Sequence, residues 1–144
     1  MPSFYAQACD ELSKPVPDIP KALELLKRAI VGGNAEAMYF LGSWYTYGHN
    51  VEKNMKLGVA LIERAAKKGV PDAMHDLAYF YEDGIEKRQN HRLAAEYYLR
   101  AALLGDEDAI HAVSRCYFHG IGFAVDKRAA KIWCDKAKSL GYYD

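Results

Sequence analysis

Three side chains that can bind an anion stand four residues apart in the last third of the sequence: His111, Arg115 and His119. Residues at i, i+4 and i+8 share one stripe of an α-helix, so these three would point the same way. Arg115 could hold a carboxylate through two parallel hydrogen bonds while the histidines assist. An anion clamp is thus one hypothesis for these residues, but the interpretation that we favour is a polar groove with no dedicated ligand.

Metal binding and catalysis have little support from the same residues. A metal site would have to combine His75 and His111 with Glu82, but Arg115 places a cation beside His111 and the sequence has no closely spaced ligand set. It also has no serine or cysteine in a recognisable catalytic motif and no glycine-rich phosphate loop. We predict no catalytic residue, no metal, no cofactor and no enzyme. A hydrolase that uses the histidines is the alternative.

The elements that position these side chains follow from a strict repeat. Glycines recur every 36 residues, at Gly33, Gly69, Gly105 and Gly141. Small residues keep the same register in a column formed by Ala22, Gly58, Ala94 and Ala130. A fixed period of this length indicates stacked supersecondary units, each too small to bury its apolar face alone.

Each repeat is predicted to hold two antiparallel helices. Ala73, Leu77 and Tyr81 form the buried stripe of a first helix, which Gly84 ends. Asn90 begins the second helix as its N-cap, because its side-chain oxygen can accept from the first-turn amides. The equivalent residues in the other repeats are Asp18, Asn54 and Asp126.

Two further expectations concern packing. The buried stripe of the second helix is predicted to be Ala94, Tyr97, Tyr98 and Ala101. The tyrosines of the first helices are predicted to fill gaps between neighbouring repeats: Tyr45, Tyr81 and Tyr117. The chain is thus an all-α single repeat domain over residues 1–144, with a partial, degenerate N-terminal capping unit and three full 36-residue repeats: 1–36, 37–72, 73–108 and 109–144.

Several of these positions resemble a known family. The first full repeat carries Ala37, Leu41-Gly42, Tyr45 and Gly48, and the last carries Gly120-Ile121-Gly122, Val125, Asp126, Ala130 and Trp133. This pattern resembles the Sel-one-like repeat (SLR) family, which is tetratricopeptide-like, and it covers the whole chain. The resemblance implies an α/α superhelix (solenoid) and a role as adaptor or scaffold in a protein complex.

The cysteines differ from those of some exported members of that family, which carry one cysteine pair in each repeat. This chain has only Cys9, Cys116 and Cys134. An odd number without a close pair fits neither a disulfide framework nor a zinc site. We expect free thiols in a reducing compartment.

Residues opposite the buried stripe of the first helices are the candidates for partner binding. In such arrays that side is concave, and here it carries Tyr, His and Arg, of which Tyr and Arg are favoured at binding hot spots. The candidates are Tyr39, Ser43, Thr46, Tyr47, His75, Tyr79, Glu82, Asp83, His111, Arg115, Phe118 and His119, with Ser3, Gln7, Asp10 and Glu11 in the N-terminal unit. The alternative is an ordinary solvated surface, because single exposed aromatic residues are common.

Charge and hydropathy exclude other partners. The sequence has 19 Lys and Arg against 19 Asp and Glu, so no overall field attracts nucleic acid or a membrane surface. No apolar run approaches the roughly 20 residues of a membrane helix. If Met1 is the natural start we expect a cytoplasmic protein, with an exported protein that has lost its signal as the alternative. The basic column of Arg28, Arg64, Arg100 and Lys136 is interpreted as last-turn cations that offset the helix dipole.

These observations predict a protein–protein interaction adaptor that holds a peptide or folded domain of a protein partner in the concave groove. An immunity-type inhibitor that neutralises a toxin or effector is the alternative, and it would bind one partner more tightly. No helix follows the last predicted pair, so its surface around Trp133, Tyr142 and Tyr143 is also a candidate for a weak homodimer through the C-terminal end.

Overall fold

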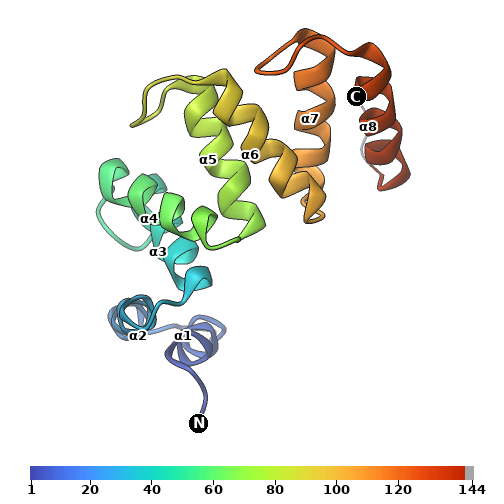
Figure 1. The fold of residues 1–144 in the computed structure, drawn as a ribbon. Helices are drawn as coiled ribbons and strands as arrows, with labels where there is room; N and C mark the ends of the chain where they lie inside the picture. The colour runs from blue at the N-terminus through green and yellow to red at the C-terminus, as the bar shows by residue number, and fades with distance from the viewer. Residues whose placement is uncertain (142–144) are drawn as a thin grey trace. The chain divides into compact units, whose positions relative to one another are not determined.

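The computed structural model describes residues 1–141, and in this range the chain folds into helices joined by short loops, without strands (Figure 1). The helices are α1 Phe4–Leu12, α2 Ile19–Val31, α3 Ala35–Tyr47, α4 Met55–Lys67, α5 Pro71–Asp83, α6 His91–Leu103, α7 Glu107–His119 and α8 Lys127–Ser139. The prediction of an all-α array of helix pairs is confirmed.

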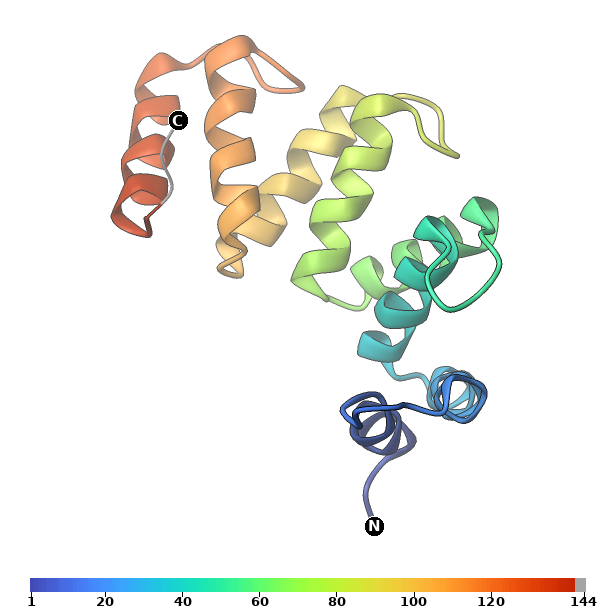
Figure 2. The ribbon, with the colours of Figure 1, turned by 180° about the vertical axis from the view of Figure 1, so that it is seen from behind.

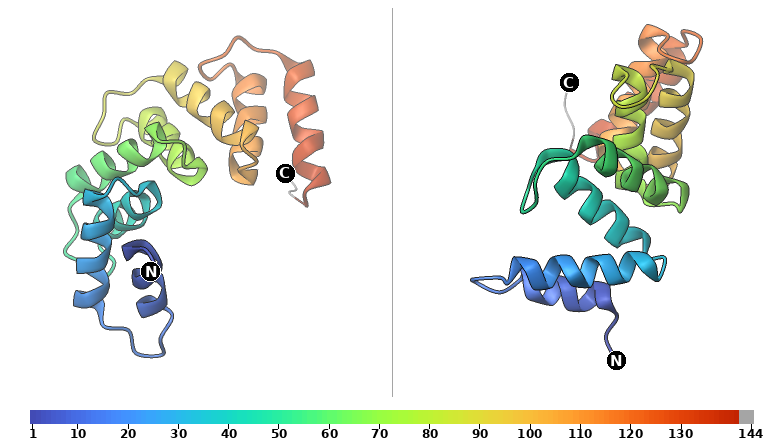
Figure 3. Two further views of the ribbon diagram at one scale, coloured as in Figure 1. Left: turned by 60° about the horizontal axis from the view of Figure 1, so that its bottom comes forward. Right: turned by 90° about the vertical axis from the view of Figure 1, so that its left-hand side faces the viewer.

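The helices form two compact units, one over residues 1–70 and one that begins at Pro71. In the first unit α1 pairs with α2 and α3 with α4, while α2 also packs on α3 (Figure 3). In the second unit α5 pairs with α6 and α7 with α8, while α6 also packs on α7 (Figure 2). Each unit is therefore two successive helix hairpins that share their apolar faces.

The predicted N-caps stand at the start of the second helix in each helix pair. The side-chain oxygen of each cap accepts a hydrogen bond from the backbone N–H three residues later, at 2.9–3.1 Å. The four caps are Asp18, Asn54, Asn90 and Asp126. Past the other end of these helices, Gly105 and its equivalents adopt the left-handed φ that was expected of them, 93° for Gly105.

The small residues allow close helix contact, most clearly between α3 and α4. A Cβ atom placed on Gly58 would lie 2.6 Å from the backbone nitrogen of Thr46 and 2.7 Å from the carbonyl oxygen of Gly42. Thr46 is buried there, and its hydroxyl donates to the Gly42 carbonyl at 2.7 Å. The prediction that Thr46 lies on the partner-binding surface is therefore wrong, because the residue is part of the α3–α4 contact.

The large buried residues of the first helices are not the predicted tyrosines. Trp44, Phe80 and Cys116 are buried, whereas the tyrosines that follow them are only half-buried. Each residue of an α-helix turns the chain by about 100°. The residue at i+8 therefore points about 80° away from residue i, whereas the residue at i+7 points almost in the same direction as residue i. Tyr81 instead stacks on Tyr97 with ring centroids 6.1 Å apart, at the edge of the core.

The second helices show the same kind of shift. Tyr98 and the predicted alanines are buried as expected, but Tyr97 is only half-buried. Ala95 and Ala102 are buried in addition. The buried surface of α6 is thus wider than predicted, because it contacts α7 as well as α5.

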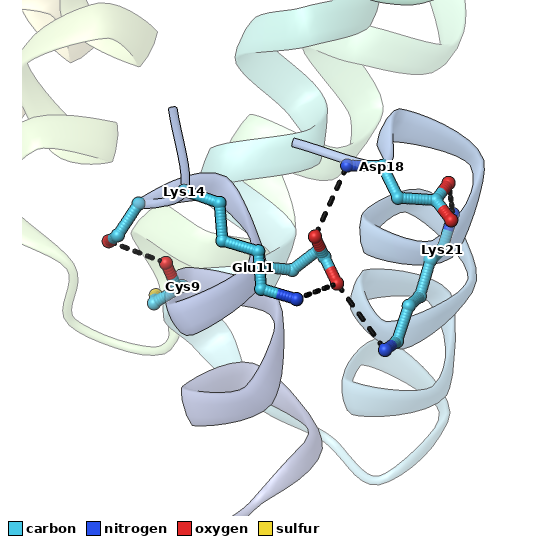
Figure 4. A network of polar contacts seen from close by, with 6 residues as sticks. Cys9, Glu11, Lys14, Asp18 and Lys21 are labelled. Atoms are coloured by element: carbon cyan, nitrogen blue, oxygen red, sulfur yellow. Dashed lines mark hydrogen bonds and ion pairs between the residues drawn. The ribbon is translucent and has the colours of Figure 1, made fainter. Parts of the chain in front are cut away.

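Glu11 joins α1 to the start of α2, in the first unit (Figure 4). Its carboxylate accepts from the Asp18 backbone N–H at 3.2 Å and pairs with Lys14 at 3.0 Å and Lys21 at 3.3 Å. Only 5% of the side chain is exposed. Glu11 was predicted to face a partner. That prediction is wrong, because its carboxylate is buried and its interactions hold the loop between α1 and α2 closed.

Candidate protein-binding site

A hollow of about 540 Å³ lies between α7 and α8 in the second unit. We call it the α7–α8 groove and define it by its lining residues: His111, Ser114, Arg115, Phe118, His119, Lys127, Ala130, Lys131, Cys134, Asp135 and Lys138. It gathers four of the predicted binding residues, all of them on α7: His111, Arg115, Phe118 and His119.

The two walls of the groove are held in place by local signals in the sequence. Asp106 caps the start of α7 by accepting from the Ala109 N–H at 2.9 Å, and Gly120, at φ 71°, ends the helix. The Ser114 hydroxyl donates to the carbonyl of Ala130 at 2.7 Å and ties α7 to α8. Ala130 is buried, so a small residue permits this close approach of the two helices.

The lining of the groove is mainly basic. Lys127, Lys131 and Lys138 come from α8, and among the lining residues within 1–141 the one carboxylate is that of Asp135. Asp135 pairs with Lys131 at 2.8 Å, and this pair lowers the pKa of Asp135. The surface between the helices therefore offers an excess of positive charge to a ligand.

Phe118 supplies an apolar contact point in the same groove. Half of its surface is exposed, and its ring lies 4.9 Å from that of His119. The ammonium group of Lys127 stands 5.5 Å from the centre of the Phe118 ring. Exposed aromatic rings such as that of Phe118 are enriched in surfaces that recognise other proteins.

Arg115 already holds a carboxylate of its own chain. Its guanidinium donates to both oxygens of Glu82 on α5, at 2.7 and 2.9 Å, and lies over the ring of Tyr98 on α6. The Tyr98 hydroxyl also donates to Glu82 at 2.9 Å. The Arg115 guanidinium holds the pKa of Glu82 below its ordinary value, and burial raises the pKa of Tyr98. The anion clamp considered for Arg115 is therefore not formed with a ligand, because both donors of the guanidinium are paired with Glu82 of the same chain.

The other predicted residues of α5 lie outside the lining of the groove. His75 is half-buried, with Nδ1 3.5 Å from Asp76 and its ring 5.5 Å from that of Tyr98. The hydrogen bond to Asp76 raises the pKa of His75. Tyr79 and Asp83 are exposed, and the negative charge of Asp83 raises the pKa of Tyr79.

The predicted residues of the first unit are arranged along α3 and α1. Tyr39 and Ser43 are half-buried, and the Ser43 hydroxyl donates to the Tyr39 carbonyl at 2.9 Å. Tyr47 is exposed, with its ring 6.2 Å from that of His49. In α1, Ser3 serves as the N-cap, and Asp10 is exposed. The Gln7 amide donates to the carbonyl of Pro2.

In residues 1–141, no group of three or more His, Cys, Asp or Glu is placed to hold a metal ion. In the same range Cys9, Cys116 and Cys134 form no disulfide bond. Burial raises the pKa of the Cys116 thiol to about 11, so this thiol is protonated at neutral pH. None of the described helices has the length and apolar character to cross a membrane.

The repeat matches a known family along the chain. The model of the Sel1 repeat matches four consecutive segments: residues 12–34, 35–70, 71–106 and 107–142. The chain belongs to the Sel1 repeat family. The resemblance seen in the sequence is thereby confirmed, and proteins built from Sel1 repeats typically mediate protein interactions.

Solved Sel1 repeat structures are similar to this chain. A Sel1 repeat protein from Oxalobacter formigenes is 32% identical, with a TM-score of 0.78 over 83% of this chain and 90% of that chain. A protective antigen of uropathogenic Escherichia coli with an SLR fold is 25% identical, with a TM-score of 0.88 over 96% of this chain but 30% of its own length.

An immunity protein from Pseudomonas aeruginosa shares the fold. It is 20% identical, with a TM-score of 0.63 over 96% of this chain and 53% of that chain. Among curated proteins, none matches this chain.

The Sel1 repeat register contains a signal for the α8 residues that the sequence analysis missed. Ala95, Tyr98 and Ala102 of α6 are buried, and the residues 36 positions later are Lys131, Cys134 and Lys138. At two equivalent positions, the alanine of α6 is thus replaced by a lysine in α8. A comparison of second helices between repeats, in addition to first helices, would have found this basic surface.

Proposed function

We propose that this Sel1 repeat protein is an adaptor that binds a protein partner, and that the α7–α8 groove is a main part of its binding surface. The observation that carries the proposal is the groove itself, a hollow of about 540 Å³ that combines an exposed aromatic ring with several cations. Aromatic residues are enriched at protein interfaces. The family supports a binding role, since its members typically mediate protein interactions.

The roles of the predicted residues differ under this proposal. Phe118, His111 and His119 contact the partner directly. Arg115 and Glu82 act mainly by holding α5, α6 and α7 together, since their charges pair with each other. Tyr79 and Asp83 are exposed on α5 and extend the surface available to a large partner.

Site-specific photo-cross-linking in cells of the source organism tests the proposal. A photoreactive phenylalanine analogue replaces Phe118 in one variant and Leu103 in the control. Leu103 is an exposed residue of α6 that does not line the groove. We expect a discrete cross-linked protein from position 118 and none from position 103. Equal cross-linking at both positions, or none at position 118, would contradict the proposal.

An immunity-type inhibitor is the second candidate, motivated by the name of the fold neighbour from Pseudomonas aeruginosa. It would use the same surface, but with one partner and slow dissociation. Calorimetry on the purified cross-linked partner separates the two. An inhibitor requires a Kd in the nanomolar range or below, whereas an adaptor that exchanges partners works at roughly micromolar Kd.

A further inference from the structure

The tyrosine near the end of each first helix is covered differently from one repeat to the next. Tyr117 of α7 stacks on Phe123 of the following loop, with ring centroids 4.6 Å apart and 23° between the ring planes. Tyr81 of α5 is covered by Lys87 of its own following loop, whose ammonium group lies 5.4 Å from the ring centre. Lys87 and Phe123 are 36 residues apart, so the same position of the repeat covers both rings.

In the α3–α4 repeat that position is Val51, and the equivalent ring is that of Tyr45. Within residues 1–141, no other aromatic ring and no cation lies over the Tyr45 ring. A hollow of about 610 Å³ lies beside it. We call it the Tyr45 hollow and define it by its lining residues, all in the first unit: Leu23, Tyr45, Asn50, Val51, Glu52, Lys53 and Asn54.

The α5–α6 repeat has an equivalent hollow of about 500 Å³, lined by Tyr81, Lys87 and the residues around them. There the chain itself places a side chain on the tyrosine ring, through Lys87. The Tyr45 hollow thus differs from its equivalent in that its ring is left available to a side chain from outside.

The loop that forms the hollow follows the same path in all three repeats. The backbone N–H of Asn54 donates to the carbonyl of Tyr45 at 2.8 Å, and the equivalent bonds in the next two repeats measure 2.8 and 2.9 Å. Asn50 has a left-handed φ of 60°, and the equivalent residues have φ 54° and 72°. The backbone therefore places Val51 where Phe123 lies in the last repeat, and the shorter side chain leaves the ring uncovered.

We propose that the Tyr45 hollow binds an aromatic side chain of a protein partner, which stacks on Tyr45 as Phe123 stacks on Tyr117. Leu23 and Val51 line the hollow and supply apolar surface that the incoming ring buries. Stacking on Tyr45 fixes the orientation of that ring. This site lies in the first unit, so it goes beyond the function proposed for the α7–α8 groove.

A cationic side chain fits the hollow less well, although Lys87 covers Tyr81. Among the lining residues within 1–141, Glu52 supplies one carboxylate and Lys53 one cation, so the hollow has no excess of negative charge. The hollow also includes Asn54, the N-cap of α4, and the N-terminus of a helix carries partial positive charge. The electrostatics therefore do not attract a further cation, whereas a neutral ring is not affected by them.

Methyl NMR of the full-length, isotope-labelled protein with a capped amino acid tests the proposal. The probe is N-acetyl-phenylalanine amide, and the controls are the same derivatives of leucine and arginine. We expect saturable shifts of the Leu23 and Val51 methyl signals, with a ring-current contribution that leucine and arginine cannot produce. The phenylalanine derivative should bind at least about 3-fold more tightly than either control, because stacking adds to burial.

Protein variants locate the site. Val51→Phe gives the α3–α4 repeat the ring that the last repeat has at Phe123, so it should fill the hollow and abolish the shifts at Leu23. The reciprocal Phe123→Val should uncover Tyr117 and add a second set of saturable shifts there. The matched control, Val16→Phe, makes the same change at an exposed position of the first unit that does not line the hollow, and should leave the Kd unchanged. Circular dichroism and melting curves confirm that each variant is folded.

Three results would overturn the proposal: no saturable shift with the phenylalanine derivative, equal or tighter binding of the leucine or arginine derivative, or unchanged binding by Val51→Phe. Self-association of the parent protein that Val51→Phe abolishes would overturn it as well, because the ring would then come from a second copy of the chain. Photo-cross-linking at position 118 does not involve the Tyr45 hollow, so the two proposals succeed or fail separately.

Discussion

The contact between Glu82 and Arg115 decides how the second unit is held together. It links α5 to α7 through two hydrogen bonds, and Tyr98 of α6 adds a third to the same carboxylate. Glu82 is largely buried, whereas 36% of the Arg115 side chain is exposed. A residue that a sequence pattern places on a binding surface can therefore be used for packing, because its partner is 33 residues away in sequence.

Arg115→Lys tests this structural role. Lysine keeps the positive charge but loses the planar pair of donors, so one acceptor of Glu82 is left without its partner. We expect the free energy of unfolding to fall by ~1–2 kcal/mol, measured by urea denaturation. The exposed control Lys131→Arg should change it by less than ~0.5 kcal/mol. An unchanged stability of Arg115→Lys would show that the bidentate geometry contributes nothing.

Glu11 gives the first unit a dependence on pH. The Asp18 backbone N–H and Lys14 hold the pKa of Glu11 below its ordinary value of 4.5. The unfolded chain therefore binds this proton more readily than the folded one, so the contribution of Glu11 is complete above pH 4.5 and is lost as the pH falls through the lowered pKa.

The corresponding variant is Glu11→Gln. We expect it to melt at a lower temperature than the parent protein at pH 6, and the difference to shrink towards zero as the pH approaches 3. Thermal melts at several pH values in this range measure the effect. A difference that stays constant from pH 6 to pH 3 would mean that the charge of Glu11 has no role.

At the scale of the helices, the close contact of α3 and α4 depends on glycine. Alanine normally favours a helix over glycine by ~1 kcal/mol. At position 58, however, the added Cβ would overlap the backbone of α3 at Gly42 and Thr46. The α5–α6 pair has Ala78 and Ala94 at the equivalent positions, so the two helix pairs differ in how closely they can approach.

Gly58→Ala should therefore destabilise the protein in spite of its favourable helix propensity. Overpacking against backbone that cannot move easily costs ~1–3 kcal/mol, which exceeds the propensity gain. Calorimetry measures the loss, and the reverse change in the other pair, Ala94→Gly, serves as the control with a loss of ~1 kcal/mol. A more stable Gly58→Ala would show that α3 and α4 can separate at little cost.

The sequence predicted the helices and their ends well because these depend on local chemistry. An Asx residue before a helix and a glycine after it act within one turn, as Asn90 and Gly105 do here. The faces of the helices were predicted less well. Trp44 and Phe80 are in the core where the neighbouring tyrosines were predicted. The periodicity of a helix places its buried stripe only to within about one residue, and the packing of the neighbouring helices decides which residue is buried. Thr46 and Glu11 show that polar residues can be buried when the backbone supplies their partners.

At the scale of the molecule, the charge on α8 bears on self-association. The sequence suggested a weak homodimer around Trp133, Tyr142 and Tyr143. The two tyrosines lie outside the described residues. The described lining of the groove has more Lys and Arg side chains than carboxylates, so a two-fold contact through it would bring like charges together. We therefore expect the described groove surface to oppose such a contact.

We accordingly predict a monomer at micromolar concentration and low salt. Sedimentation equilibrium at 50 mM and 500 mM salt measures the association constant, and any dimer should be stronger at 500 mM, where the repulsion is screened. Association that is strongest at 50 mM salt would contradict this expectation, because it would require attraction between the charges at the contact.

Binding of the partner at the α7–α8 groove is tested most directly by an amide chemical-shift titration of the isotope-labelled protein with the purified partner. At 16.2 kDa the chain is well suited to this measurement. We predict that the largest shifts fall on residues 111–119 of α7 and 127–138 of α8, and that Lys131→Glu with Lys138→Glu removes them. Largest shifts on α3, around Tyr39 and Tyr47, with α7 and α8 unchanged, would contradict it.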